Sequence, residues 1–493
     1  MNDISSPISL DHTAIRRIIL GVMVALLLGA MDQTIVAPAL PTIGREFADL
    51  EQLPWVVTAY LLSSTAATPL YGKLSDIKGR RTMLLIAVAI FIAGSVLCAL
   101  AWSLPTLIIA RFIQGLGGGG LIAIPQTVVG DLVSPRERPR YQAYLATVFV
   151  TASIVGPIFG GFFAEHLHWS LIFWINLPLG AVALAMMWND LRLLPQNHRP
   201  HQLDMIGAAL MIVSTTLLLL GLSWGGVTYP WRSAVILGLL AASGLGWVLF
   251  ALRLTRAKEP FIPLSVLFHP VVAVGVTASF FAVGAMVGLS IYVPIYFEEL
   301  RGLTASLSGL GLMTMMTGTV VGAVISGRVM GKTPRYKRSP MIGMALATVV
   351  TAFLAYAAAD LSLVAFEIFL AIIGIGIGTQ FPVMTVSIQN AVAAHELGTA
   401  TANLNFFRSL GSAVLVAAYG AIFFSTLGIG RDRMETPEAL AEQVARAGGD
   451  LNAVFALVFA AAAVTLGIAT LCIFAMKELP LRGHGEHPAH SGN

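Results

Sequence analysis

The stretch GKLSDIKGRR, residues 72–81, decides the fold because it is a charged turn between two long apolar segments. It combines four basic residues with one acid: Lys73, Lys78, Arg80, Arg81 and Asp76. This much charge cannot lie in hydrocarbon, whereas the flanking segments are long enough to cross a bilayer. Because Lys and Arg collect in cytoplasmic loops, the turn also indicates which side faces the cell interior. On composition alone, the stretch needs no role other than to set the topology, as a loop with solvated charges.

The composition of the whole chain agrees with a lipid environment. Of the 493 residues, 57% are hydrophobic and 11% are charged, and the mean hydropathy is +0.82. This balance is typical of a chain that is surrounded mostly by lipid. The net charge of +4 points to no particular partner. Cys98 and Cys472 both fall in apolar segments, so we expect no disulfide framework.

Apolar runs of about 20 residues predict fourteen membrane-spanning helices, and therefore an all-α polytopic membrane protein. The predicted spans are 18–40, 54–71, 83–102, 106–129, 141–164, 170–188, 205–224, 234–252, 271–297, 306–329, 341–359, 361–387, 404–426 and 452–475. Most of the 29 Lys and Arg residues fall in alternate gaps, which predicts that both termini are cytoplasmic. No cleaved signal peptide is expected, because the first apolar run is too long and contains Asp32.

The spans group as six, two and six, which predicts two six-helix bundles with two inserted helices. We expect five regions: a cytoplasmic tail at 1–17, an N-terminal bundle at 18–190, basic linkers with two helices at 191–265, a C-terminal bundle at 266–476 and a cytoplasmic tail at 477–493.

The turn at 72–81, followed by Thr82-Met83-Leu84, resembles the loop between spans 2 and 3 of the major facilitator superfamily. In that family the acid and the basic residues form a charge relay that holds the two halves together in one state. The resemblance implies the major facilitator fold. It also implies that the following residues control gating without touching substrate: Gly72, Asp76, Gly79, Arg80 and Arg81.

Asp32 lies inside the first predicted span, after an uncharged stretch from Ile18. A charge at the centre of a membrane helix costs roughly 2.5–3.5 kcal/mol, so it needs a proton, a cationic partner or an aqueous cavity. It could be a proton carrier, or an acid tied to another helix for structure alone. Its segment, residues 28–41, resembles the first-span motif of fourteen-span drug:proton antiporters.

Arg111 lies in the fourth predicted span with Gln114 and Gly115 after it, and this R-x-x-Q-G pattern resembles that of proton-coupled facilitators. The resemblance implies a role in proton transfer, and an arginine stays charged in any environment. The alternative is a side chain that extends to the outer membrane surface. We therefore assign Asp32, Arg111 and Gln114 to the proton-coupling and substrate cavity, together with Glu367 as a second protonatable site.

In the fifth span, GPIFGG resembles the G-P-x-x-G-G antiporter motif, which accompanies exporters, although Ala152 replaces a family glycine. Its defining residues are Gly156, Pro157, Gly160 and Gly161. A proline with small residues favours a helix that bends and packs closely, which suits a pivot between moving helices. The alternative is close packing with no meaning for the direction of transport.

Two further polar residues lie in spans. Asn176 is a candidate for a hydrogen bond between helices, in a stretch that resembles a signature of the fourteen-span antiporters. Arg408 matches another family pattern, and we expect its side chain to extend to the cytoplasmic surface.

Several chemistries are excluded or disfavoured. The run 115–120 satisfies G-x-G-x-x-G inside a span, where its glycines favour close helix contact instead. The stretch 326–333 comes close to the nucleotide-binding pattern G-x-x-x-x-G-K-T but does not match it, because Ser326 stands where the first glycine is required. ATP hydrolysis is therefore excluded as the energy source. A membrane enzyme would have to use the cluster Glu165, His166 and His168, which more plausibly marks an outer loop.

Together these motifs resemble the fourteen-span drug:H+ antiporter family, of the EmrB/QacA type. The resemblance implies efflux of small, lipophilic compounds across the plasma membrane, driven by protons and without another cofactor or a metal. Import of a metabolite by proton symport is the alternative. Expected partners are the substrate and the bilayer, with no nucleic acid; the chain is expected to be monomeric, and whether it needs a membrane-fusion adaptor stays open.

Overall fold

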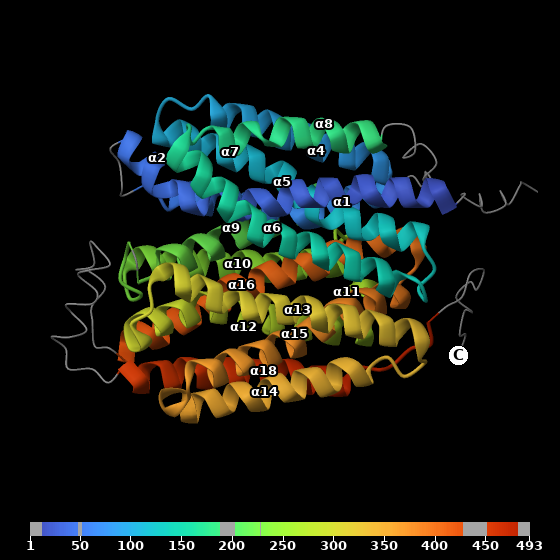
Figure 1. The fold of residues 1–493 in the computed structure, drawn as a ribbon. Coiled ribbons are helices and arrows are strands. Elements are labelled where there is room, and N and C mark those ends of the chain that lie inside the picture. The colour runs from blue at the N-terminus through green and yellow to red at the C-terminus, as the bar shows by residue number, and fades with distance from the viewer. Residues whose placement is uncertain (1–11, 48–51, 188–202, 227, 427–450, 482–493) are drawn as a thin grey trace, which may run out of the picture. The chain divides into compact units, whose positions relative to one another are not determined.

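Backbone polar groups find no water in lipid, so an apolar segment must form its hydrogen bonds internally, as a helix does. The computed structural model describes residues 12–47, 52–187, 203–226, 228–426 and 451–481. Regular structure in these ranges is helical (Figure 1). The predicted tails and the linker at 191–202 lie wholly or partly outside the described residues.

Twelve helices in the described residues are long and apolar enough to cross a membrane. They run over Ile15–Phe47, Arg80–Ala99, Leu104–Leu132, Arg138–His166, Met205–Trp224, Ala234–Arg256, Pro270–Arg301, Leu307–Lys332, Arg338–Asp360, Leu363–Ala391, Ala394–Phe423 and Leu451–Ala475. The chain is thus a multi-pass, all-helical membrane protein. The short turn expected at Asp360 is confirmed, because α14 (Arg338–Ala357) ends before it and Ser362 caps α15 (Leu363–Ala391).

The predicted count of fourteen spans is not supported. The segment predicted at 54–71 forms α3 (Trp55–Lys78), a helix of 24 residues whose last turns carry Lys73, Asp76 and Lys78 and are therefore less apolar. The segment predicted at 170–188 is interrupted, giving α7 (Leu171–Trp174) and α8 (Asn176–Met187). Both are helical. Helix α3 is as long as several of the twelve but less apolar, whereas the segment Leu171–Met186 is apolar but shorter.

The chain divides into two compact units, of which the first comprises residues 1–134 and 151–200. In it, α5 (Leu104–Leu132) packs against α3, α4 (Arg80–Ala99) and α1 (His12–Ile35), and α1 packs against α8. Figure 1 shows these helices running side by side. The unit also holds α2 (Leu40–Phe47), after the short helix η1 (Ala37–Ala39), and the part of α6 (Arg138–His166) that follows residue 150.

The glycine run of α5 brings this helix into backbone contact with its neighbours, as the sequence predicts. A Cβ on Gly117 would lie 2.5 Å from the backbone nitrogen of Phe91 in α4. A Cβ on Gly119 would lie 2.5 Å from the carbonyl oxygen of Ser64 in α3. A side chain at either position would therefore separate the helices.

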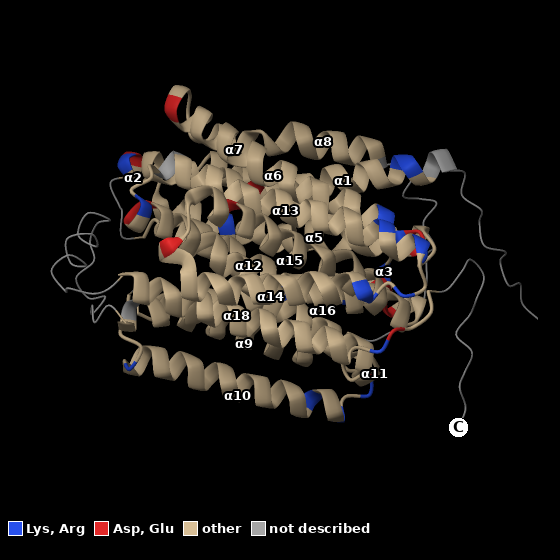
Figure 2. Ribbon diagram, turned by 60° about the horizontal axis from the view of Figure 1, so that its bottom comes forward, with Lys and Arg blue, Asp and Glu red and all other residues tan. Residues whose placement is uncertain are grey.

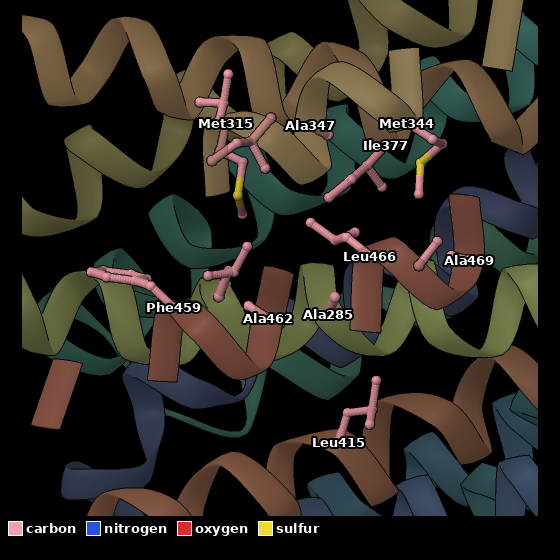
Figure 3. Packing of buried hydrophobic residues seen from close by; sticks show 14 of the residues in the cluster. Ala285, Met315, Met344, Ala347, Ile377, Leu415, Phe459, Ala462, Leu466 and Ala469 are labelled. Atoms are coloured by element: carbon pink, nitrogen blue, oxygen red, sulfur yellow. The ribbon is translucent and has the colours of Figure 1, made fainter. Parts of the chain in front are cut away.

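The second unit comprises residues 135–150 and 201–493. Its core, shown in Figure 3, is formed by side chains such as Met315, Ile377, Phe459 and Leu466. They come from a group of long helices: α12 (Pro270–Arg301), α13 (Ala305–Lys332), α14, α15, α16 (Leu397–Thr426) and α18 (Leu451–Ala475). The short elements α11 (Leu264–Leu267) and η4 (Ala394–Glu396) precede α12 and α16.

Helices α9 (Met205–Trp224) and α10 (Ala234–Arg256) form a pair within the second unit. They pack mainly on each other, and α9 also contacts α16. Ser243 donates a hydrogen bond to the carbonyl of Ser214, and Arg253 pairs with Asp204, whose carboxylate also caps α9. Most of the side chains of α10 are not buried, as expected for a helix that faces lipid.

Charged side chains gather at the ends of the helices and in the connections between them, while the middles of the helices are nearly free of them (Figure 2). The turn at 72–81 follows this pattern. It is made by Gly79, which ends α3 and precedes α4 with φ of 88° and ψ of 148°.

Replacing Gly79 by Ala is expected to lower the free energy of unfolding by about 1–3 kcal/mol, because this backbone region is open essentially to glycine alone. Thermal unfolding of the purified protein in detergent measures the effect. Gly238 of α10 is a matched control, since a Cβ there meets no atom within 4 Å. Gly238→Ala should leave stability unchanged or raise it. Equal unfolding temperatures for Gly79→Ala and the wild type would contradict the prediction.

Candidate functional site

A buried ion pair between α1 and α5 forms the centre of the candidate site. Arg111 Nη1 donates to Asp32 Oδ2 at 2.6 Å. The side chains are 1% and 0% exposed, respectively. The sequence analysis assigned both residues to one site, and the structure places them in contact. The alternative for Arg111, a side chain extending to the membrane surface, is wrong because the ion pair holds it inside the unit.

Side-chain amides from α5 and α8 complete the hydrogen bonding of Asp32. Gln114 Nε2 donates to Asp32 Oδ1 at 2.8 Å and also to Ser95 Oγ of α4 at 2.8 Å. Asn176 Nδ2, at the start of α8, lies 3.2 Å from both of these acceptors. The carboxylate of Asp32 therefore accepts hydrogen bonds at both oxygens.

The guanidinium of Arg111 is held on its other sides as well. Its Nε donates to the carbonyl of Val56 at 3.0 Å, and its Nη1 also donates to Gln114 Oε1 at 2.7 Å. The ring of Tyr60 lies 4.3 Å from the guanidinium carbon, at a distance typical of a cation–π contact. Arg111 is thus oriented by α1, α3 and α5 together.

The arrangement makes the contact between α1 and α5 depend on the charge of Asp32. While Asp32 is ionised, it neutralises a cation that has no access to bulk water. A proton on Asp32 would remove that charge and leave Arg111 with neutral partners and an aromatic ring. The side-chain pairing between α1 and α5 would then weaken, which gives protonation a direct route to helix movement.

A second polar cluster lies at the turn of residues 72–81, where three helices of the first unit meet. Arg80 of α4 donates to Asp76 at 2.5 Å and to Ser75 at 2.7 Å, both in α3. It also donates to Asp131 near the end of α5, at 2.8 Å. The sequence analysis selected Asp76 and Arg80 but missed Asp131, because nothing in its local sequence marks it as their partner.

The antiporter-type motif of α6 packs closely on α1. Thr34 Oγ1 donates to the carbonyl of Ala152 at 2.8 Å. A Cβ on Gly156 would collide with the side chain of Thr34, and one on Gly160 would collide with the carbonyl of Ile35. Pro157 lies inside the helix, and Gly161 faces Pro38. The motif therefore contacts the segment directly after Asp32.

Glu367 belongs to the second unit, whereas the Asp32 network lies in the first. This residue lies near the start of α15, in the second unit, where its Oε1 faces Gly311 of α13. Its Oε2 is buried without a hydrogen-bond partner among the described residues.

Arg408 also differs from expectation. It is buried within the second unit, so the predicted extension of its side chain to the cytoplasmic surface is wrong.

Sequence reasoning missed several members of the buried network. Ser95 and Tyr60 have no distinctive context, and Cys98, interpreted as an apolar residue, lies 3.5 Å from Gln114 Oε1. Asn176 was recognised as a hydrogen-bonding residue, but its partners could not be named. Each of these residues comes from a different helix than its partner.

The enzyme alternative gains nothing from the geometry. His166 and His168 are exposed at the end of α6 and beyond it, and His168 lies 3.8 Å from Glu46. No group of three or more potential metal ligands occurs among the described residues.

Comparison with known proteins places the chain in a family. A family model described as Major Facilitator Superfamily matches residues 22–416. The chain belongs to this superfamily, and it is a transporter rather than an enzyme.

Curated relatives cover most of the chain. An uncharacterized MFS-type transporter of Mycobacterium tuberculosis is 36% identical over 83% of the chain, which spans 59% of that protein's length. The multidrug transporter protein MdtP of Bacillus subtilis is 34% identical, covering 83% of the chain and 76% of its own length. Multidrug resistance protein 3 of the same organism is 31% identical over 82% of this chain and 79% of its own length.

Solved structures agree on the fold. The proton:xylose symporter XylE aligns with a TM-score of 0.63 at 15% identity, covering 96% of this chain and 98% of its own. The human organic anion transporter MFSD10 aligns with a TM-score of 0.61 at 16% identity, and the alignment covers 94% of this chain and 99% of that transporter. At this level of identity the likeness concerns the fold alone.

The Asp32–Arg111 pair predicts a non-additive pattern of stability. Asp32→Asn or Arg111→Gln alone should each lower the free energy of unfolding by about 3–5 kcal/mol, since each leaves a buried charge unpaired. The double variant should be more stable than either single variant, because both charges are gone. Thermal unfolding of the four proteins in detergent tests this. Additive losses would show that the two charges do not depend on each other.

Proposed function

We propose that this protein exports small, lipophilic compounds across the plasma membrane in exchange for protons. The observation that carries the proposal is the buried Asp32–Arg111 pair, in which a single carboxylate, a group able to accept a proton, holds the contact between two helices. The printed names of relatives, among them a multidrug transporter and a multidrug resistance protein, support export of drug-like compounds.

The proposed cycle uses alternating access. A proton from outside neutralises Asp32 and weakens its hold on Arg111, and its release to the cytoplasm restores the pair. The Arg80 cluster with Asp76 and Asp131 is the proposed gate, since its ion pairs join three helices in one state and can separate in the other. The close packing of α6 on the segment after Asp32 supports transmission of the movement.

Three structural details are part of the same proposal. Helix α3 and the α7–α8 segment cross the membrane too, in addition to the twelve long apolar helices, as in the fourteen-span drug antiporters. Both termini are cytoplasmic, on the side of the basic turn at 72–81. The carrier works as a monomer with protons as its coupling ion, without another cofactor.

The first test is efflux of ethidium from energised cells that express the protein. Efflux above the empty-vector control, abolished by a proton uncoupler, is the expected result. Proton-dependent accumulation of a small metabolite, with no ethidium efflux, would instead favour the symport alternative.

Asp32→Asn should abolish uncoupler-sensitive efflux, because the side chain can no longer exchange a proton. Asp32→Glu, which keeps a titratable carboxyl group, should retain part of it. Asp360→Asn is the matched control, since Asp360 is exposed in the turn between α14 and α15. Immunoblotting of membranes verifies insertion of each variant. Full efflux by Asp32→Asn at normal membrane levels would refute proton coupling through this residue.

A further inference from the structure

A second buried arginine, Arg408 on α16, lies within the second unit and is 8% exposed. Its Nη2 lies 3.2 Å from Thr385 Oγ1 of α15, and its Nη1 lies 3.4 Å from Asn405 Oδ1. The guanidinium carbon is 5.2 Å from the centre of the Phe381 ring. Its Nε has no hydrogen-bond partner among the described residues.

The surroundings of Arg408 differ from those of Arg111 in one respect that matters. Arg111 contacts a carboxylate at 2.6 Å. In the part of the chain that the structure describes, no carboxylate lies within ion-pair distance of Arg408. An arginine cannot escape burial by losing its proton. The two neutral oxygens and the ring therefore leave its charge uncompensated.

The same two helices contain further polar groups with unused hydrogen-bonding capacity. Gln380, next to Phe381 in the sequence, accepts from Ser279 Oγ at 3.2 Å, but its Nε2 has no partner among the described residues. Neither amide atom of Asn403 has one. Buried polar groups are nearly always paired, and among these atoms the Nε of Arg408 is the charged donor that a bound molecule could satisfy.

We propose that Arg408 is the anion-binding residue of a substrate site in the second unit, and that its ligands are lipophilic organic anions. The planar guanidinium matches the two oxygens of a carboxylate or sulfonate, and its Nε is free to donate. Phe381 provides an apolar surface beside the charge, which suits a ligand with an aromatic body. This assignment rests on the proposed function, whose substrate class it names.

The test compares two dyes that share a xanthene core but differ in charge. Binding of fluorescein, an anion, and rhodamine 6G, a cation, is measured by fluorescence anisotropy on the full-length protein in chloride-free buffer. Arg408→Gln should raise the Kd for fluorescein at least tenfold and change that for rhodamine 6G less than twofold. Arg328→Gln is the matched control, because Arg328 is an exposed arginine of α13 in the same unit.

Arg408→Lys keeps the charge but loses the planar fork, and should weaken fluorescein binding by a smaller factor than Arg408→Gln. This variant keeps the test decisive if Arg408→Gln does not fold. An unchanged Kd for fluorescein in a folded Arg408→Gln protein would overturn the proposal. Parallel loss of both dyes together with a lower unfolding temperature would also overturn it, since the role would then be structural.

Chloride titration separates organic from inorganic anions. Chloride binding that depends on Arg408, combined with fluorescein binding that does not, would overturn the assignment of organic anions. Transport in proteoliposomes separates this inference from the proposed function. Fluorescein that binds through Arg408 but is not moved by a proton gradient would leave the site standing and refute proton-driven export of this ligand.

Discussion

The neutralisation of Arg111 by Asp32 is the constraint on which the first unit depends. Neither charge is tolerable alone in the interior of a membrane helix, so α1 and α5 must lie at a distance that lets them meet. Gln114 and Asn176 then follow, because the remaining oxygen of the carboxylate needs donors, and Ser95 accepts a further hydrogen bond from each of these two amides. Helices α3, α4 and α8 pack around the ion pair because each of them supplies a side chain or carbonyl to its hydrogen-bond network.

Periodicity and charge in the sequence were sufficient for the helical architecture. Apolar length predicted where helices lie. The charged stretch 72–81 does contain the reversal between two helices, but the turn is confined to Gly79, because residues 72–78 belong to α3 and Arg80 begins α4. Fourteen apolar segments were counted where twelve helices in the described residues are long and apolar enough, for two reasons. Ser63, Ser64, Thr65 and Thr68 make α3 less apolar within the predicted span, and the break at Ile175 divides α7 from α8. A hydropathy average cannot identify a helix that is apolar at one end and polar at the other.

The candidate site was predictable in its charges and not in its contacts. Asp32 and Arg111 are conspicuous because ionisable groups are rare in spans. Asp131 and Ser95 are ordinary in their own segments, and only the packing of distant helices makes them partners. Arg408 was misjudged for a related reason: its distance from the span end allowed it to reach water, but the direction of its side chain is set by α15.

The glycine run of α5 has a consequence for how this helix can vary. Arg111 and Gln114 point to one side, which is closed by backbone contacts to α3 and α4. Ile109, Phe112 and Leu116 are exposed by 62%, 42% and 36% on another side. Tolerance to substitution along α5 should therefore repeat with the period of the helix. Apolar residues should replace one another freely on the exposed side, and almost no substitution should be tolerated on the opposite side. A library of single substitutions would show the helical repeat directly, with the lipid-facing stripe as the region where sequences drift.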